Sequence, residues 1–119
     1  MSTHKGFYIS KTVKGFDVYL SRDHWVNAKN PIMPCRSLED AEHCIDNMMN
    51  GVPIVQVMSP RTDKWEDFTS IKDESDLYYG VLMCDGKHPE FKGRFRIIAH
   101  LPSVPRRVAI YPEDEREPI

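Results

Sequence analysis

The chain has 119 residues, 40% of them hydrophobic and 29% charged, which is typical of a globular protein rather than a disordered one. No apolar run approaches the roughly 18 residues that a membrane-spanning helix requires, so we expect a soluble protein. The net charge of −2 argues against a dedicated nucleic-acid-binding protein, because such domains are usually basic. The length predicts a single domain over residues 1–112, followed by a charged, mobile tail over residues 113–119.

Two further features bear on where the protein acts. The first residues are followed by only a short apolar run, and the small-residue cleavage pattern of a secretory signal is missing. The three cysteines are odd in number and irregularly spaced, so they do not form a disulfide framework. We therefore expect a cytoplasmic protein with Cys44 in its core, and the spacing leaves the roles of Cys35 and Cys84 open.

Charge is segregated along the chain although the total is small. Residues 4–30 and 85–107 are positive, whereas residues 35–76 and 113–117 are negative. This alternation fits either surface patches that attract one another as the segments assemble or a binding surface of two signs.

The first part of the chain is predicted to form strands and turns. Residues 7–13 predict one strand, and residues 16–20 alternate between apolar and polar as in a half-buried strand that faces a helix. Turn-forming residues then precede Trp25-Val26, so residues 16–28 are predicted to form a hairpin. The two prolines within residues 30–34 indicate a break in regular structure.

A helix from Ser37 to Gly51 is indicated by several independent signals. Ser37 suits the N-cap because its hydroxyl can accept a hydrogen bond from a first-turn amide, and Asp40 completes a capping-box pattern. Acidic residues in the first turn complement the helix dipole. Gly51 is expected to adopt the left-handed conformation that ends a helix. The apolar stripe that should face a sheet consists of Leu38, Ala41, Ile45 and Met48, with Cys44 and Met49 on its flank.

The chain after this helix is predicted to be mostly extended. Residues 52–58 form a compact, β-branched run that predicts a buried strand. Residues 64–76 are acidic and carry apolar residues at helical intervals, so either a short helix or an extended strap fits them. Residues 77–84 predict a strand in which Gly80 marks a bulge.

The C-terminal part predicts a final antiparallel pair. Residues 85–93 are expected to form a long hairpin loop, and residues 94–101 return as a strand whose apolar and polar residues alternate. Residues 107–111 predict a last short strand. Together these elements predict an α+β fold, in which one antiparallel sheet of about five strands carries one main helix on one face.

No motif in the sequence carries a strong catalytic, metal or cofactor signature. The five histidines are scattered, and no pair has the i, i+4 spacing that presents two metal ligands on one helix face. Cys84 and His88 lie four residues apart, but the paired cysteines of a structural zinc site are missing. Glu90-Phe91-Lys92 has the Glu-x-Lys spacing of metal-dependent nucleases but falls in a predicted loop. We therefore expect no catalytic residue, no metal and no cofactor.

The basic strand offers an enzymatic alternative, a small metal-independent ribonuclease. Such an enzyme needs a base, cations for the phosphate and an acid, roles that Glu, Arg and His can fill. Arg94, Arg96 and His100 share one face of the predicted strand, and Glu90 precedes them. An ordinary solvent-facing strand shows the same alternation, and we favour that interpretation.

The same strand offers a second alternative, the binding of RNA or DNA. Lysine and arginine contact phosphates, and aromatic rings stack on bases. The acidic segments of this chain would compete with such binding. The residues that fit this function, besides Arg94 and Arg96, are Tyr78, Tyr79, Lys87, Phe91, Lys92, Arg106 and Arg107.

We favour a non-enzymatic interaction protein that regulates or inhibits a protein partner. Exposed aromatic residues beside arginine are typical of binding hot spots, and an acidic run suits a basic partner surface such as that of a nucleic-acid-binding protein. Small, motif-poor α+β chains of this kind are typical of accessory or anti-defence proteins of phages and mobile elements. The sequence leaves the oligomeric state open. The predicted partner-binding residues are Trp65, Glu66, Asp67, Phe68, Asp73, Glu74, Asp76, Arg94 and Arg96.

Overall fold

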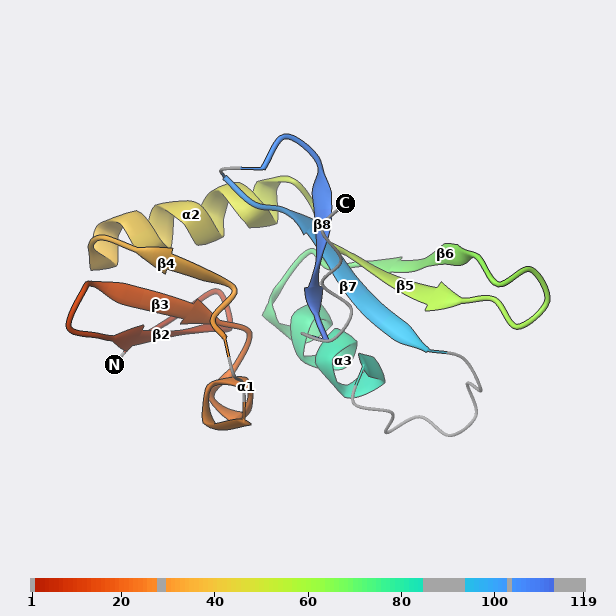
Figure 1. The fold of residues 1–119 in the computed structure, drawn as a ribbon, viewed down its shortest axis with the longest axis horizontal. Helices are drawn as coiled ribbons and strands as arrows, with labels where there is room; N and C mark the ends of the chain where they lie inside the picture. The colour runs from red at the N-terminus through yellow and green to blue at the C-terminus, as the bar shows by residue number, and fades with distance from the viewer. Residues whose placement is uncertain (1, 28–29, 85–93, 103, 113–119) are drawn as a thin grey trace.

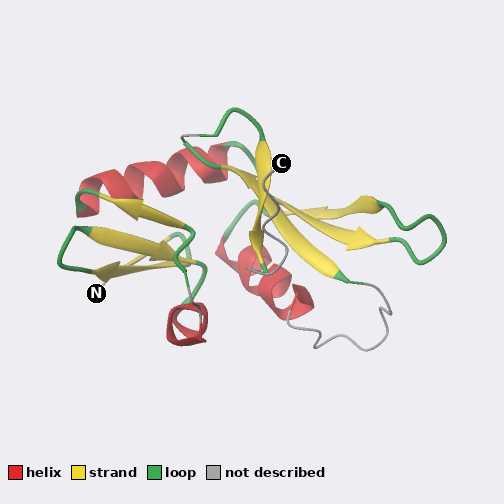
Figure 2. Ribbon diagram, in the orientation of Figure 1, coloured by secondary structure: helices red, strands yellow, loops and turns green. Residues whose placement is uncertain are grey.

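A computed structural model describes residues 2–27, 30–84, 94–102 and 104–112. These residues form an α+β fold with two four-stranded antiparallel sheets and three helices (Figure 1 and Figure 2). The α+β class is confirmed, but the prediction of one sheet of about five strands with one main helix is wrong. None of the helices in the described ranges has both the length and the apolar character needed to cross a membrane. The predicted loop at 85–93 and tail at 113–119 lie outside the described residues.

The first sheet has the strand order β1–β2–β3–β4. β4 was not predicted, and it pairs antiparallel with β3 inside the segment where the prolines indicated a break. Pro34 is tolerated there because β4 is an edge strand, in which not every amide must donate a hydrogen bond. The strands are β1 Ser2–His4, β2 Phe7–Lys11, β3 Phe16–Tyr19 and β4 Met33–Cys35.

The hairpin predicted over residues 16–28 is wrong, because the chain after β3 forms the short helix α1, Arg22–Asn27. Ser21 starts this helix. Its hydroxyl accepts a hydrogen bond from the His24 amide at 3.1 Å, and its carbonyl accepts one from the Trp25 amide at 3.0 Å. Trp25 consequently packs beside Tyr8, with ring centroids 5.2 Å apart, instead of pairing in a strand.

The helix α2, Leu38–Asn50, confirms the main predicted helix. Its N-cap is Ser37, whose hydroxyl accepts a hydrogen bond from the Asp40 amide at 3.0 Å. The C-terminal end differs from the prediction: Gly51 has a right-handed φ of −75°, and Val52 instead has the positive φ, 52°. The helix packs on β2, β3 and β4 and buries Ala41, Ile45, Met48 and Met49.

The second sheet has the strand order β6–β5–β7–β8. Residues 64–76 had been compatible with either a short helix or an extended strap. Their first half is extended and forms β6, which pairs antiparallel with β5. The register shifts between Val55 and Gln56, so β6 contains a bulge that disturbs the period-two pattern. The strands are β5 Ile54–Met58, β6 Trp65–Ser70, β7 Phe95–His100 and β8 Arg107–Tyr111.

The helix α3, Glu74–Cys84, replaces the strand predicted over residues 77–84. Two carboxylates fix its start: that of Asp73 accepts from the Asp76 amide at 3.1 Å, and that of Asp76 accepts from the Lys72 amide at 3.1 Å. Gly80 is no bulge but the point where α3 meets β5, since a Cβ there would lie 3.0 Å from Val55 Cγ2. α3 therefore covers one face of the second sheet.

One hydrophobic cluster joins the two sheets. Figure 1 shows α2 running from the first sheet toward the second, where its end approaches β7 and β8. The buried ring of His24 in α1 marks the junction, because it lies edge-on to Tyr19 of β3 and Tyr111 of β8, with centroid distances of 5.6 and 5.3 Å. The sequence analysis did not single out this histidine.

Candidate functional site

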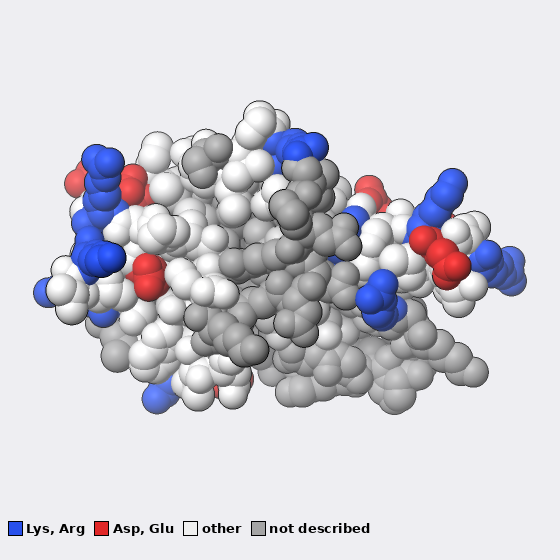
Figure 3. Space-filling view, in the orientation of Figure 1, with Lys and Arg blue, Asp and Glu red and all other residues white. Residues whose placement is uncertain are grey.

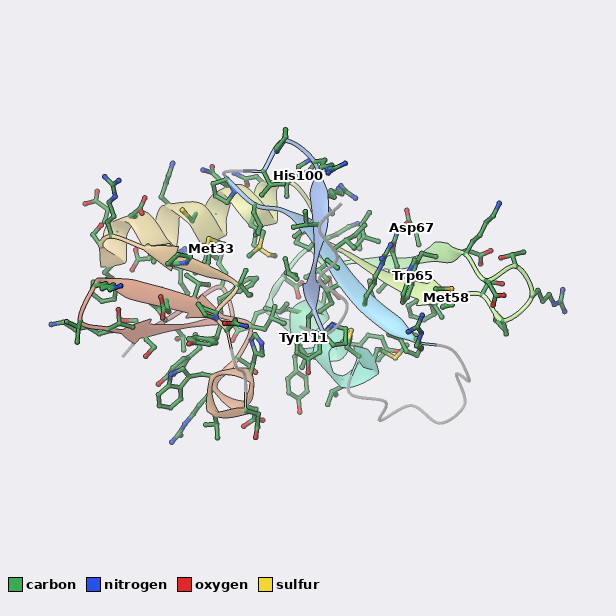
Figure 4. All side chains as sticks on the ribbon, in the orientation of Figure 1. Met33, Met58, Trp65, Asp67, His100 and Tyr111 are labelled. Carbon is green, nitrogen blue, oxygen red and sulfur yellow. The ribbon has the colours of Figure 1, made fainter. Side chains whose placement is uncertain are left out.

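The side chains of the second sheet fall on two faces. Val55 points toward Gly80 of α3, so the alternation of a strand sends its neighbour Gln56 to the opposite face. We call this opposite face the outer face. Figure 4 shows three of its residues, Met58, Trp65 and Asp67, close together on β5 and β6. The outer face carries Ile54, Gln56, Met58, Trp65, Asp67, Arg94, Arg96 and Ile98.

The indole ring of Trp65 is the centre of the outer face. The guanidinium carbon of Arg96 lies 4.2 Å from the ring centroid, and that of Arg94 lies 5.7 Å from it. Both distances are within the range of about 6 Å at which a cation is attracted to an aromatic ring. Trp65 and Arg96 are half-buried, whereas Arg94 is exposed. The stack thus presents an aromatic ring and two cations in a fixed arrangement.

A polar network across three strands holds Arg96 in place. Arg96 Nε donates a hydrogen bond to Gln56 Oε1 at 3.0 Å, and Gln56 Nε2 donates to Asp67 Oδ1 at 2.9 Å. The sequence analysis missed Gln56. Its signal was present, since Gln56 is the polar residue in the apolar run of β5 and must face away from the core.

The structure brings together four of the nine predicted partner-binding residues: Trp65, Asp67, Arg94 and Arg96. Phe68 lies on the other face of the sheet, where its ring meets Phe95 edge-on at 6.1 Å between centroids. It is 38% exposed. Glu66 is exposed and pairs with Val57, so alternation also directs it away from the outer face.

The remaining three predicted residues lie at the start of α3. Asp73 and Asp76 form the cap described above. Glu74 lies in the first turn and packs beside Gly6, since a Cβ added to Gly6 would lie 2.9 Å from Glu74 Cγ. The predicted acidic surface is therefore divided between the sheet and this helix end. Helix capping explains why aspartates stand at positions 73 and 76, so no binding partner is needed to explain them.

The residues of the ribonuclease alternative do not converge. Arg94 and His100 share a face of one strand but are six residues apart, which corresponds to about 20 Å along an extended chain. Figure 4 shows His100 at the opposite end of β7 from Trp65. Glu90 lies outside the described residues. The described side chains therefore do not form a centre at which one phosphate could meet both a cation and a proton donor.

The residues of the nucleic-acid alternative are also separated. Tyr78 and Tyr79 are exposed on α3, on the side of the sheet opposite Arg94 and Arg96. Arg107 Nη2 donates a hydrogen bond to the Gly51 carbonyl at 3.0 Å. In the view of Figure 3, charged side chains of the described residues are visible at both ends and at the top centre, rather than in one continuous patch. Lys87, Phe91 and Lys92 lie outside the described residues.

A second cluster lies where β4 meets α2 in the first sheet. It consists of Cys35, Asp40 and Cys44, whose ligand atoms all lie within 4.8 Å of one another. Cys35 is buried, Cys44 is half-buried and Asp40 is exposed. The sequence analysis left Cys35 open and expected Cys44 in the core, because only the pairing of β4 with β3 brings Cys35 to this helix.

Comparisons with protein-family models, with curated proteins and with solved structures gave no match. Function is therefore inferred from the residues of this chain alone.

Proposed function

We propose that the chain is a non-enzymatic interaction protein, which regulates or inhibits a protein partner by covering part of its surface with the outer face. The observation that carries this proposal is the contact of the Trp65 ring with two arginines, whose guanidinium carbons lie 4.2 Å (Arg96) and 5.7 Å (Arg94) from the ring centroid. Tryptophan and arginine are the residue types most enriched in binding hot spots. Because the stack already exists in the unbound chain, less side-chain entropy is lost when a partner binds.

The chemistry of the outer face suits a protein surface that combines a carboxylate with apolar side chains. The exposed guanidinium of Arg94 can bind a carboxylate through two parallel hydrogen bonds. Met58 supplies half-buried apolar surface beside it, and Ile54 supplies more at the other end of β5. Methionine adapts its shape to irregular partner surfaces.

Two features favour a protein over a nucleic acid at this face. Arg96 lies over the Trp65 ring, so a base would have to displace a guanidinium to stack there. Asp67 places a negative charge within hydrogen-bond distance of the same network, where it repels phosphates.

Affinity purification of the tagged chain from its native cells, followed by mass spectrometry, tests the proposal. The variant Arg94→Glu reverses a charge on the outer face, and Tyr78→Glu is the matched control at an exposed site on α3. We expect a protein that survives nuclease treatment to co-purify with the wild type and with Tyr78→Glu. Its affinity for Arg94→Glu should be at least about tenfold weaker.

Two results would count against the proposal. In one, the partner is lost on nuclease digestion, and direct titrations with RNA or DNA show binding that weakens steeply with salt. In the other, the partner binds Arg94→Glu as well as the wild type.

A further inference from the structure

The cluster of Cys35, Asp40 and Cys44 combines residues from two elements. Asp40 and Cys44 are four positions apart on α2, so both side chains project from one face of the helix. Cys35 ends the edge strand β4, and the turn through Ser37 brings its sulfur to the same face. Each side chain offers one ligand atom, and the three atoms lie within 4.8 Å of one another.

We propose that these three side chains bind a zinc ion, with water as the fourth ligand. In a tetrahedral zinc site the bonds are about 2.3 Å to sulfur and about 2.0–2.2 Å to oxygen, so ligand atoms lie roughly 3.5–3.8 Å apart. Since the ligand atoms lie within 4.8 Å of one another, the cluster needs a closure of about 1.3 Å at most, which side-chain rotations provide. Two sulfurs and one carboxylate favour zinc over the hard ions magnesium and calcium.

Burial and nearby acidic groups act on the two thiols of the cluster. Burial raises the pKa of Cys35 to about 12, and Cys44, Asp40 and Asp17 add to the rise. Burial and Asp40 also raise the pKa of Cys44. The raised pKa of each thiol favours its protonated form while no metal is bound. A zinc ion changes this balance, because coordination converts both thiols to thiolates and releases their two protons to water.

The carboxylate of Asp40 is held in place by the cap of α2. The Arg36 amide lies 3.3 Å from Asp40 Oδ2 and donates a hydrogen bond to it. This bond orients the carboxylate, one oxygen of which lies within 4.8 Å of both sulfurs, as outer hydrogen bonds do in known metal sites. The cluster belongs to the first sheet, so the zinc proposal does not depend on the outer face of the second.

Titration of the full, phosphine-reduced chain with Co²⁺ and then Zn²⁺ tests this site. We expect one equivalent of Co²⁺ to give a near-ultraviolet band from sulfur-to-cobalt charge transfer, which Zn²⁺ removes. The Kd for Zn²⁺ should be about 1 μM or lower. Cys44→Ser should weaken Zn²⁺ binding by at least about 100-fold and Asp40→Asn by about tenfold. Cys84→Ser, the same change at the third cysteine, should leave it unaltered.

Circular dichroism and thermal unfolding establish that each variant is folded. Asp40→Asn retains an oxygen for the Arg36 amide, so it decides the question if Cys44→Ser fails to fold. Equal Zn²⁺ affinity in the wild type and Asp40→Asn, or a cobalt spectrum without the sulfur band, would overturn the site. The site would also be overturned if the reduced protein takes up no metal and peroxide instead joins Cys35 and Cys44 in a disulfide, seen as a mass loss of two hydrogens.

Discussion

The stack on Trp65 depends on the shape of the arginine side chain as well as on its charge. Arg96 contacts the ring and at the same time donates through Nε to Gln56, a combination that requires a planar guanidinium. A lysine keeps the positive charge but has no nitrogen in the Nε position. The geometry of the outer face is therefore sensitive to a change that conserves charge.

We predict that Arg96→Lys lowers the free energy of unfolding by about 0.5–1 kcal/mol, because it removes the stacking and the hydrogen bond to Gln56. The emission of Trp65 should also shift. Because the chain has two tryptophans, this shift is measured in a Trp25→Phe background. Arg106→Lys, at an exposed site, is the control and should change neither quantity. Unchanged Trp65 emission in Arg96→Lys would mean that the stack does not persist in solution.

Asp46 ties α2 to the turn between β1 and β2. Its Oδ1 lies 2.8 Å from Lys5 Nζ and 2.7 Å from His4 Nε2. The hydrogen bonds from Lys5 and His4 lower the pKa of this carboxyl below its ordinary value of 3.8. The folded state thus holds the ionised form more strongly than the unfolded chain does. This contribution is complete above the unfolded pKa and is lost as the pH falls through the lower, folded value.

Asp46→Asn should accordingly be less stable than the wild type at neutral pH. The difference between the two should shrink as the pH falls below about 4, because protonation removes the charge that the substitution has already removed. Denaturant unfolding of both proteins between pH 7 and pH 3 measures this. A difference that stays constant over the whole range would show that the ionised carboxylate is not what stabilises the fold.

Gly15 allows the β2–β3 turn to approach β4. Its φ is 152°, and a Cβ at this position would lie 2.3 Å from the Cys35 carbonyl oxygen. Gly15→Ala should therefore lower the free energy of unfolding by about 2 kcal/mol, because backbone must move to admit the methyl group. Chemical denaturation measures the loss. A variant as stable as the wild type would show that the turn and β4 are farther apart than described.

At the level of elements, α2 and α3 both begin at polar caps, but only α2 could be predicted from the sequence. α2 was predictable because its cap and apolar stripe all lie within one short segment. α3 was mistaken for a strand because the apolar run over residues 77–84 suits either structure. The deciding signal, Asp73 followed three residues later by Asp76, was present but was interpreted as part of a binding surface.

The pairing of the two sheets could not be predicted in the same way. β5 pairs with β7 across a long stretch of chain, and no local pattern specifies that register. Trp65 and Phe68 are three residues apart, a spacing that also fits a helix, but strand alternation places them on opposite faces of β6. The shared face of Arg94 and Arg96 was predictable from alternation alone, whereas their contact with Trp65 required the strand order.

Asp73→Ala separates the capping role from partner binding. Loss of the side chain that accepts from the Asp76 amide should lower the free energy of unfolding by about 1 kcal/mol. Affinity for the co-purified partner should not change, because α3 covers the face of the sheet opposite Trp65. Stability is measured by denaturation and affinity by calorimetry. If Asp73→Ala weakens partner binding more than Arg94→Glu does, the acidic helix end belongs to the contact surface.

At the level of the whole molecule, the two candidate sites lie on different sheets joined by α2 and one hydrophobic cluster. The cysteine cluster lies between β4 and α2, and the outer face is formed by β5, β6 and β7. Because they share no residue, we expect the effects of Asp40→Asn on Zn²⁺ binding and of Arg94→Glu on partner binding to be independent.

The most direct test of the outer face is photo-cross-linking in native cells. A benzoylphenylalanine introduced at Asp67 lies on the outer face, and one introduced at Tyr78 lies on the exposed side of α3. The proposed function predicts a nuclease-resistant cross-link to one protein from position 67 and none from position 78. Cross-links to that protein from position 78 alone, or cross-links to nucleic acid from position 67, would contradict it.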